Sequence, residues 1–321
     1  MKRVCTMIIV LALLWGMNWL TVNTLSDFSY HIQIIILIGI NALMAVSLNL
    51  INGITGQFSM GHAGFMAIGG YVAAALTFYG DPILARWFGT LLPLAVIETV
   101  WFLVALIVGG IAAALCGLIV GLPTLRLRGD YLAMATLGVG EIVRVIILNW
   151  EAVGGARGFP GIAERANFFW VFAFLIGGTW ILFHLTQSPK GKAFAAIRED
   201  EIAASSIGIS TTRVKVIAFV VGAFFAGLGG GLFAHSMTYL HTNTFTFVKS
   251  FEYVAMVVLG GMGSFTGAII AAVILTALPE VLRMASEYRM VIYSLLIIIM
   301  MIVRPKGLMG HYEFSFRKLF P

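Results

Sequence analysis

Long apolar runs separated by short polar interruptions are the main pattern of this sequence. Because about 20 apolar residues in a helix cross the roughly 30 Å core of a bilayer, these runs predict membrane-spanning helices. The period-two alternation of a membrane β-barrel is absent. The sequence therefore predicts an all-α polytopic membrane protein. The candidate spans are 4–21, 31–51, 57–79, 97–121, 131–150, 168–187, 214–236 and 288–303, with a glycine-interrupted region at 248–281.

The region 248–281 decides the number of crossings. Lys and Arg favour the cytoplasmic side of a membrane, and they gather in the loops 122–130 and 188–213. If 248–281 crossed once, the basic tail after residue 303 would lie on the opposite side from those loops. A split at Gly260–Gly263 returns the tail to the cytoplasmic side. We therefore expect about ten transmembrane helices (nine to ten), some of them discontinuous, with both termini in the cytoplasm.

Composition supports a membrane protein and excludes several other classes. Hydrophobic residues make up 60% of the 321 positions, charged residues 11%, and mean hydropathy is +0.99. The net charge of +6 comes from Lys and Arg in short loops, so topology rather than nucleic-acid binding accounts for it. Two cysteines give no disulfide framework and no zinc motif. The N-terminal segment 4–21 lacks a small-x-small cleavage site, which favours an uncleaved first helix over a signal peptide.

The longest polar interruption is the stretch 188–215. Its middle, Lys192–Ile207, contains neither Pro nor Gly and predicts one short helix between Ser188-Pro189 and Gly208. Such a helix either rests on lipid headgroups or docks a soluble partner. In the docking interpretation four charged residues form the rim of the contact, and small residues let the partner approach. These residues are Arg198, Glu199, Asp200, Glu201, Ala203, Ala204 and Gly208.

Polar residues inside the spans are the other candidates, because lipid penalises them. Glu141 and Arg144 are three residues apart on a predicted helix, where they form either a structural ion pair or part of a substrate path. Gln57, Ser59 and His62 follow the Asn52-Gly53 turn. They either cap a helix and bond between helices, or line a gate or pathway. We expect His235 to lie at the membrane interface, near the end of its span.

Enzyme motifs are absent from the sequence. There is no nucleotide-binding P-loop, no H-E-x-x-H and no G-x-S-x-G, so no catalytic residue, metal site or cofactor is predicted. The glycine run Gly227–Gly231 lies in an apolar helix and indicates helix packing. The stretches Gly56–Ala63 and Gly263–Ala268 are similar to each other, which either reflects a duplicated fold or is chance. If ATP drives this protein, the nucleotide site belongs to another chain.

Five segments in order carry a resemblance to a known family. They are Asn52–Tyr71, Leu125–Arg144, Gly155–Ile162, Ala195–Gly208 and Gly260–Gly267. Together they resemble the branched-chain amino-acid ABC transporter permeases, and the second segment resembles the part that distinguishes the LivM type from its LivH-type partner. The fourth resembles the coupling loop that contacts the ATPase in ABC importers.

This resemblance implies one permease domain over 1–321, with 188–213 as its cytoplasmic coupling loop, in a bacterial inner membrane. It implies a LivH-type permease, two cytoplasmic ATPases and a periplasmic substrate-binding protein as partners, besides the lipid bilayer. ATP-driven closure of the ATPases would move the docking helix and tilt the bundle. Two alternatives remain: a related importer for urea, amides or aromatic acids, and a self-sufficient ion-coupled secondary transporter.

Overall fold

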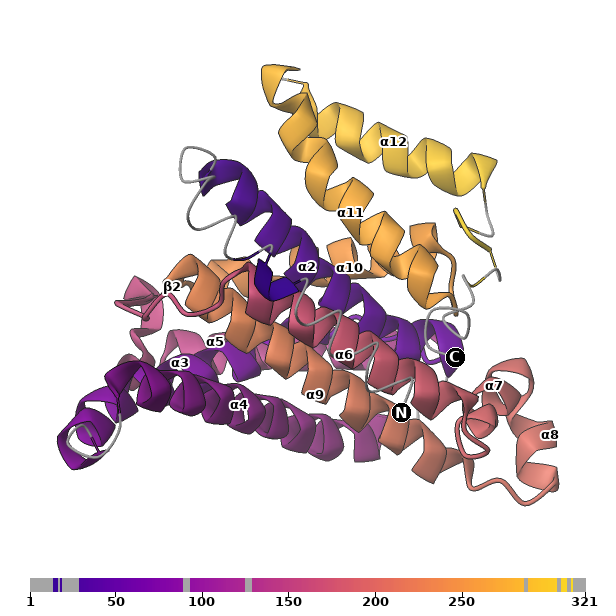
Figure 1. Cartoon of the computed structure of the whole chain (residues 1–321). Helices are drawn as coiled ribbons and strands as arrows, with labels where there is room; N and C mark the ends of the chain where they lie inside the picture. The colour runs from indigo at the N-terminus through magenta and orange to yellow at the C-terminus, as the bar shows by residue number, and fades with distance from the viewer. Residues whose placement is uncertain are drawn as a thin grey trace.

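The computed structural model describes residues 14–16, 18, 29–88, 93–124, 129–285, 288–304, 307–310 and 313. These residues are mostly helical (Figure 1). The long helices are α2 (Ser29–Asn49), α3 (His62–Phe88), α4 (Leu94–Thr124), α5 (Asp130–Leu148), α6 (Phe168–Gln187) and α9 (Thr211–Met237). The shorter helices are α7 (Lys192–Glu199), α8 (Glu201–Ser206), α10 (Phe247–Gly260), α11 (Phe265–Val281) and α12 (Arg289–Val303).

Six helices among the described residues are long and apolar enough to cross a membrane. They are Tyr30–Ile54, His62–Leu84, Ala95–Thr124, Tyr131–Leu148, Phe168–Gln187 and Thr211–Met237. Phe265–Val281 is a shorter apolar helix. The prediction of a polytopic helical membrane protein is therefore confirmed, whereas the count of ten crossings stays a prediction. Most of the candidate span 4–21 and the basic residues Arg126 and Arg128 lie outside the described residues.

Glycines allow α3, α4 and α9 to pack with their backbones close together. A Cβ on Gly227 would lie 2.6 Å from the Cβ of Ala113 and 2.9 Å from the carbonyl oxygen of Gly109, both in α4. A Cβ on Gly70 in α3 would lie 2.9 Å from the carbonyl oxygen of Gly230 in α9. Small residues give this close approach between helices in membranes. The interpretation of Gly227–Gly231 as a packing motif is confirmed.

The bundle has two chemically different ends. At one, α7 and α8 project from the bundle (Figure 1), and this is called the α7–α8 end. At the other, the strands β1 (Phe159–Pro160) and β2 (Tyr239–Leu240) pair antiparallel, with Phe159 opposite Leu240. This is called the strand end. Short 3₁₀ turns flank the strands: η3 (Glu151–Val153), η4 (Gly155–Arg157) and η5 (Thr242–Phe245).

The first helical discontinuity separates α2 from α3. α2 continues into one π-helical segment, η2 (Leu50–Ile54), and residues 55–61 are not helical. The predicted start of a span at residue 57 is therefore wrong, because α3 begins at His62. Wide π-helical turns occur mostly as single insertions in helices and often mark functional positions. The segment 50–61 is called the first break.

The second discontinuity is the expected split of region 248–281. α10 ends at Gly260 and α11 begins at Phe265, so the split is confirmed, and residues 261–264 are called the second break. The backbone N–H groups of Leu308 and Met309 donate to the carbonyl oxygens of Leu259 and Gly260, at 2.7 and 3.2 Å. Chain beyond α12 thus returns to the second break. A fourth short 3₁₀ segment, η6 (Leu282–Ala285), follows α11.

Candidate functional site

The polar stretch at the α7–α8 end forms two helices, so the prediction of one helix over Lys192–Ile207 is wrong. Asp200 separates α7 from α8 with an extended backbone, at φ −156° and ψ 113°. Its carboxylate accepts hydrogen bonds from the N–H groups of Ile202 and Ala203, at 2.8 and 3.0 Å. Aspartate favours this helix-capping position over a helix interior, which explains why a stretch without Pro or Gly breaks here.

The four residues expected to form a charged rim point in different directions. Glu199, whose side chain is 74% exposed, and Asp200 are exposed, whereas Arg198 and Glu201 are partly buried. Asp200 caps α8, and Glu201 pairs with Lys215 of α9, with 2.7 Å between Oε1 and Nζ. Arg198 turns toward the bundle, where its Nη1 donates to the carbonyl oxygen of Gly53 at 3.1 Å. Glu199 pairs with Arg198, with 2.8 Å between Oε1 and Nη2, so all four residues make internal bonds, and their contact with a partner stays a prediction.

Two of the small residues and two isoleucines are exposed on α8 and in the turn that follows it. Ala204 is buried, while Ala203 and Gly208 are exposed, and Gly208 ends the helix with φ +89°. Ile202 and Ile207 are 67% and 77% exposed. The sequence interpretation missed these isoleucines because it searched for small and charged residues. Two apolar side chains on one exposed tip suit burial against a protein or a lipid surface.

Three polar residues are buried at the first break: Gln57 and Ser59 within it, and His62 at the start of α3. The side-chain amide of Asn52 donates to the carbonyl oxygen of Ser59, whose N–H donates back to the Oδ1 of Asn52. The Nε2 of His62 lies 2.8 Å from the Oγ of Ser47 in α2. The contact between His62 and Ser47 joins two helices, as one of the two expectations held. Helix capping by these side chains and a role in a gate or pathway stay predictions.

Lys215 connects the first break with α8. The amide of Gln57 donates to the carbonyl oxygen of Lys215 at 3.3 Å, and the ammonium group of Lys215 pairs with Glu201. Lys215 is itself buried in α9. The structure therefore brings one predicted coupling residue and one predicted path residue onto the same lysine, which sequence spacing did not indicate.

Glu141 and Arg144 form the expected ion pair in the middle of α5, with 2.7 Å between Nε of Arg144 and Oε2 of Glu141. Their side chains are 25–30% exposed. The other oxygen of Glu141 accepts the N–H of Phe247, the first residue of α10, at 3.1 Å. A carboxylate at this position also interacts favourably with the positive end of the helix dipole. α10 therefore begins beside the middle of α5.

A second ion pair, which the sequence analysis did not single out, lies in the first turns of α10. The ammonium group of Lys249 lies 2.7 Å from Oε2 of Glu252 and 5.4 Å from the ring centre of Tyr253. The sequence signal for this pair was the three-residue spacing between Lys249 and Glu252, which is the same as that between Glu141 and Arg144. Next to it, the hydroxyl of Ser250 accepts the N–H of Ala63, in the first turn of α3. The starts of α3 and α10 thus meet near the middle of α5.

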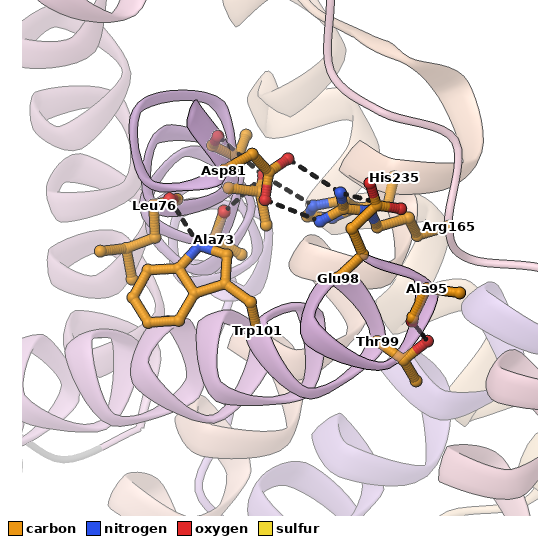
Figure 2. A network of polar contacts seen from close by, with 11 residues as sticks. Ala73, Leu76, Asp81, Ala95, Glu98, Thr99, Trp101, Arg165 and His235 are labelled. Atoms are coloured by element: carbon orange, nitrogen blue, oxygen red, sulfur yellow. Dashed lines mark hydrogen bonds and ion pairs between the residues drawn. The ribbon is translucent and has the colours of Figure 1, made fainter. Parts of the chain in front are cut away.

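The strand end contains a polar network between α3, α4, α9 and the segment before α6 (Figure 2). The guanidinium of Arg165, 13% exposed, lies 2.9 Å from Asp81 of α3 and 3.7 Å from Glu98 of α4. Nearby, the Nε2 of His235 lies 2.9 Å from the hydroxyl of Thr77. His235 is fully buried between helices, two residues before the end of α9, and its expected place at the membrane interface stays a prediction.

Several apolar spans, two breaks inside the bundle and charged pairs within spanning helices define a multi-pass membrane permease. A family model described as "Branched-chain amino acid transport system / permease component" matches residues 30–303. The chain belongs to this family.

Curated relatives agree with the family match. The chain is 38% identical over 302 residues to the high-affinity branched-chain amino acid transport system permease protein LivM of Salmonella typhimurium, covering 83% of this chain and 67% of that protein. It is 37% identical to LivM of Escherichia coli, with the same coverage. It is 28% identical to LivH of Escherichia coli, over 85% of this chain and 92% of that protein. No solved structure matches the chain significantly.

Proposed function

We propose that this chain is the LivM-type permease subunit of an ATP-driven importer for branched-chain amino acids in the bacterial inner membrane. The observation that supports this most is the family match, which includes both the spans and the α7–α8 loop. In this function the chain forms half of the translocation path beside a LivH-type permease. Two ATPase chains bind at the α7–α8 end, which is then the cytoplasmic end. A periplasmic binding protein delivers the amino acid to the strand end.

The α7–α8 end supports an ATPase contact through exposed apolar residues. Ile202 and Ile207 extend from a short helix whose base is fixed by the Glu201–Lys215 ion pair and by buried Phe194 and Ile197. A rigid base with an apolar tip suits insertion into a cleft of a soluble partner. Glu199, whose side chain is 74% exposed, lies in the last turn of α7 and adds a polar rim.

The exposed face of α5 and α10 supports a translocation path shared with a second permease. Its large apolar residues include Tyr131, Met134 and Phe251. Glu141 and Arg144 pair in the middle of α5, Lys249 and Glu252 pair in the first turns of α10, and ionisable residues within a membrane rarely face lipid. The two positive and two negative charges cancel, so this face of α5 and α10 suits a zwitterionic amino acid that passes without being held tightly.

The ATPase contact is tested by reconstituting the importer in proteoliposomes with its partner permease and ATPases. Ile202→Glu with Ile207→Glu is expected to lower ATPase co-purification and leucine uptake about tenfold or more, because two buried apolar contacts are lost. The control Lys192→Ala changes an exposed residue on α7 and is expected to bind ATPases normally. Uptake by the wild-type chain without any ATPase would contradict the proposal and favour an ion-coupled secondary transporter. Uptake of urea, amides or aromatic acids instead of leucine would favour a related importer.

The path is tested by neutralising the ion pair of α5. Glu141→Gln with Arg144→Met is expected to lower leucine uptake about tenfold while ATPase binding stays normal, since the change lies in the spans. Glu280→Gln, which alters another three-residue ion pair, serves as the control. Unchanged uptake in the double variant would assign Glu141 and Arg144 a structural role only.

A further inference from the structure

Arg198 makes contacts that a docking residue does not need. It lies in the last turn of α7, with its aliphatic part against Gly56, where an added Cβ would lie 2.8 Å from the Cγ of Arg198. Its Nη1 donates to the carbonyl oxygen of Gly53, at 3.1 Å. The same Nη1 would lie 2.9 Å from a Cβ added to Gly263. Arg198 therefore contacts the first break at two points and lies directly beside the second break.

The two breaks are also joined directly. The N–H of Gly263 donates to the Oδ1 of Asn49, at 2.9 Å, and Asn49 is the last residue of α2 before η2. Gly53 lies so close to both groups that a Cβ would collide with the Oδ1 of Asn49 and the nitrogen of Gly263. Arg198, Gly53, Asn49 and Gly263 thus form one junction between α7 and the two breaks, called the break junction.

Glycine is required at the break junction for conformation as well as space. Gly56 has φ +71° and Gly263 has φ +96°, which are conformations that other residues rarely adopt. The sequence similarity between Gly56–Ala63 and Gly263–Ala268 now has a spatial counterpart. Both stretches begin with a glycine next to the guanidinium side chain of Arg198.

Attachment of the loop to the bundle does not depend on Arg198 alone. Phe194 and Ile197 of α7 are buried, and Glu201 pairs with Lys215 of α9. These contacts fix α7 and α8 to the bundle. Among the described residues of the loop, Arg198 is the one whose side chain reaches both breaks. An arginine suits this task because its planar guanidinium presents several donors in a fixed arrangement.

We propose that Arg198 is a positioning residue that transmits movement of α7 to both helix breaks and thereby to α3, α10 and α11. This inference rests on the proposed function, since it needs an ATPase that moves α7. When α7 shifts, Arg198 displaces Gly53 and the second break together. Because α3 and α10 begin beside the middle of α5, a shift of both breaks alters the path at Glu141.

The experiment uses the complete importer in proteoliposomes and measures bound ATPase, ATP hydrolysis and leucine uptake for each variant. Arg198→Ala is expected to keep bound ATPase and hydrolysis within about twofold of wild type while uptake falls about tenfold or more. Arg198→Lys is expected to restore part of the uptake, because a lysine reaches one carbonyl group but cannot copy the planar fork. Arg213→Ala removes an exposed arginine from the same loop and is expected to behave as wild type.

Two results would overturn the inference. Wild-type uptake in Arg198→Ala would mean that Arg198 transmits nothing. A parallel loss of bound ATPase and uptake would make Arg198 a docking contact only. If Arg198→Ala does not fold, Arg198→Lys tests the inference instead. Its ratio of leucine uptake to ATP hydrolysis is then compared with that of the wild-type chain. Failure of the proposed function is distinct from these results, because the wild-type importer itself would then show no ATP-dependent uptake.

Discussion

The two ends of the bundle are stabilised in different ways. At the strand end, Arg165 joins α3 and α4 through two carboxylates, and Thr77 joins α3 to the buried His235 of α9. The paired strands β1 and β2 add backbone hydrogen bonds. At the α7–α8 end, two interrupted helices meet at glycines, and Arg198 and Asn49 supply the polar bonds of the junction.

This difference suggests which end moves. Redundant polar bonds among α3, α4 and α9 at the strand end oppose relative movement of these helices. Interrupted helices at the α7–α8 end provide positions where backbone torsions can change, while the bonds of Arg198 and Asn49 keep the two breaks joined. The strand end is therefore expected to act as the fixed base of the bundle, and the break junction as its hinge. The following substitutions test this contrast.

The largest effect is expected from Gly53→Ala. The new methyl group would lie between the Oδ1 of Asn49 and the N–H of Gly263 and would break their hydrogen bond. Leucine uptake is expected to fall about tenfold or more, with ATPase binding retained. Gly177→Ala is the matched control, because a Cβ at that helical glycine of α6 has no atom within 4 Å. Normal uptake in Gly53→Ala would show that the breaks need not stay in contact.

A smaller effect, on stability rather than coupling, is expected from Arg165→Met. Loss of the guanidinium leaves Asp81 and Glu98 without their common cation. The free energy of unfolding in detergent is expected to fall by about 2 kcal/mol, since one partner of a half-buried ion pair is removed. Arg157→Met, at an exposed arginine of the same loop, should change little. Equal melting temperatures for the two variants would contradict the view of the strand end as a fixed base.

The smallest effect is expected from Thr77→Val. Valine keeps the shape of the side chain but removes the hydroxyl that contacts the Nε2 of His235. Loss of this buried hydroxyl, which also lies 3.2 and 3.0 Å from the carbonyl oxygens of Ala73 and Ala74, is expected to cost about 1 kcal/mol in unfolding free energy, with uptake retained. Thr99→Val removes an exposed hydroxyl that bonds within α4, and its unfolding free energy is expected to change by less than about 0.5 kcal/mol. If Thr77→Val lowered leucine uptake strongly while its unfolding free energy stayed near that of the wild type, the strand end would contain a moving part.

Spans and helix breaks were predictable from the sequence because each has a local signal. Apolar length predicted the long helices, and Gly260–Gly263 predicted the second break. Local spacing also predicted the ion pair Glu141–Arg144. Aspartate is a residue type that favours helix caps, but the helix propensity of the residues around Asp200 predicted that one helix would continue through it.

Contacts between distant segments could not be predicted. The bonds of Arg198 to Gly53 and of Gln57 to Lys215 join residues more than 140 positions apart, and nothing in their spacing indicates the pairing. The exposure of Ile202 and Ile207 likewise depends on how α8 turns away from α7 after Asp200. Tertiary packing, rather than local propensity, determines which side of a short helix faces the bundle.

The most direct test measures distances between spin labels in the complete importer with and without bound ATP, in a chain whose Cys5 and Cys116 are replaced. Labels at Lys192 and Met262 report on α7 and the second break, and labels at Met262 and Tyr131 report on the second break and α5. If Arg198 joins α7 to the breaks, the first distance stays constant on ATP binding while the second changes. A change in the first distance with a constant second distance would contradict the account.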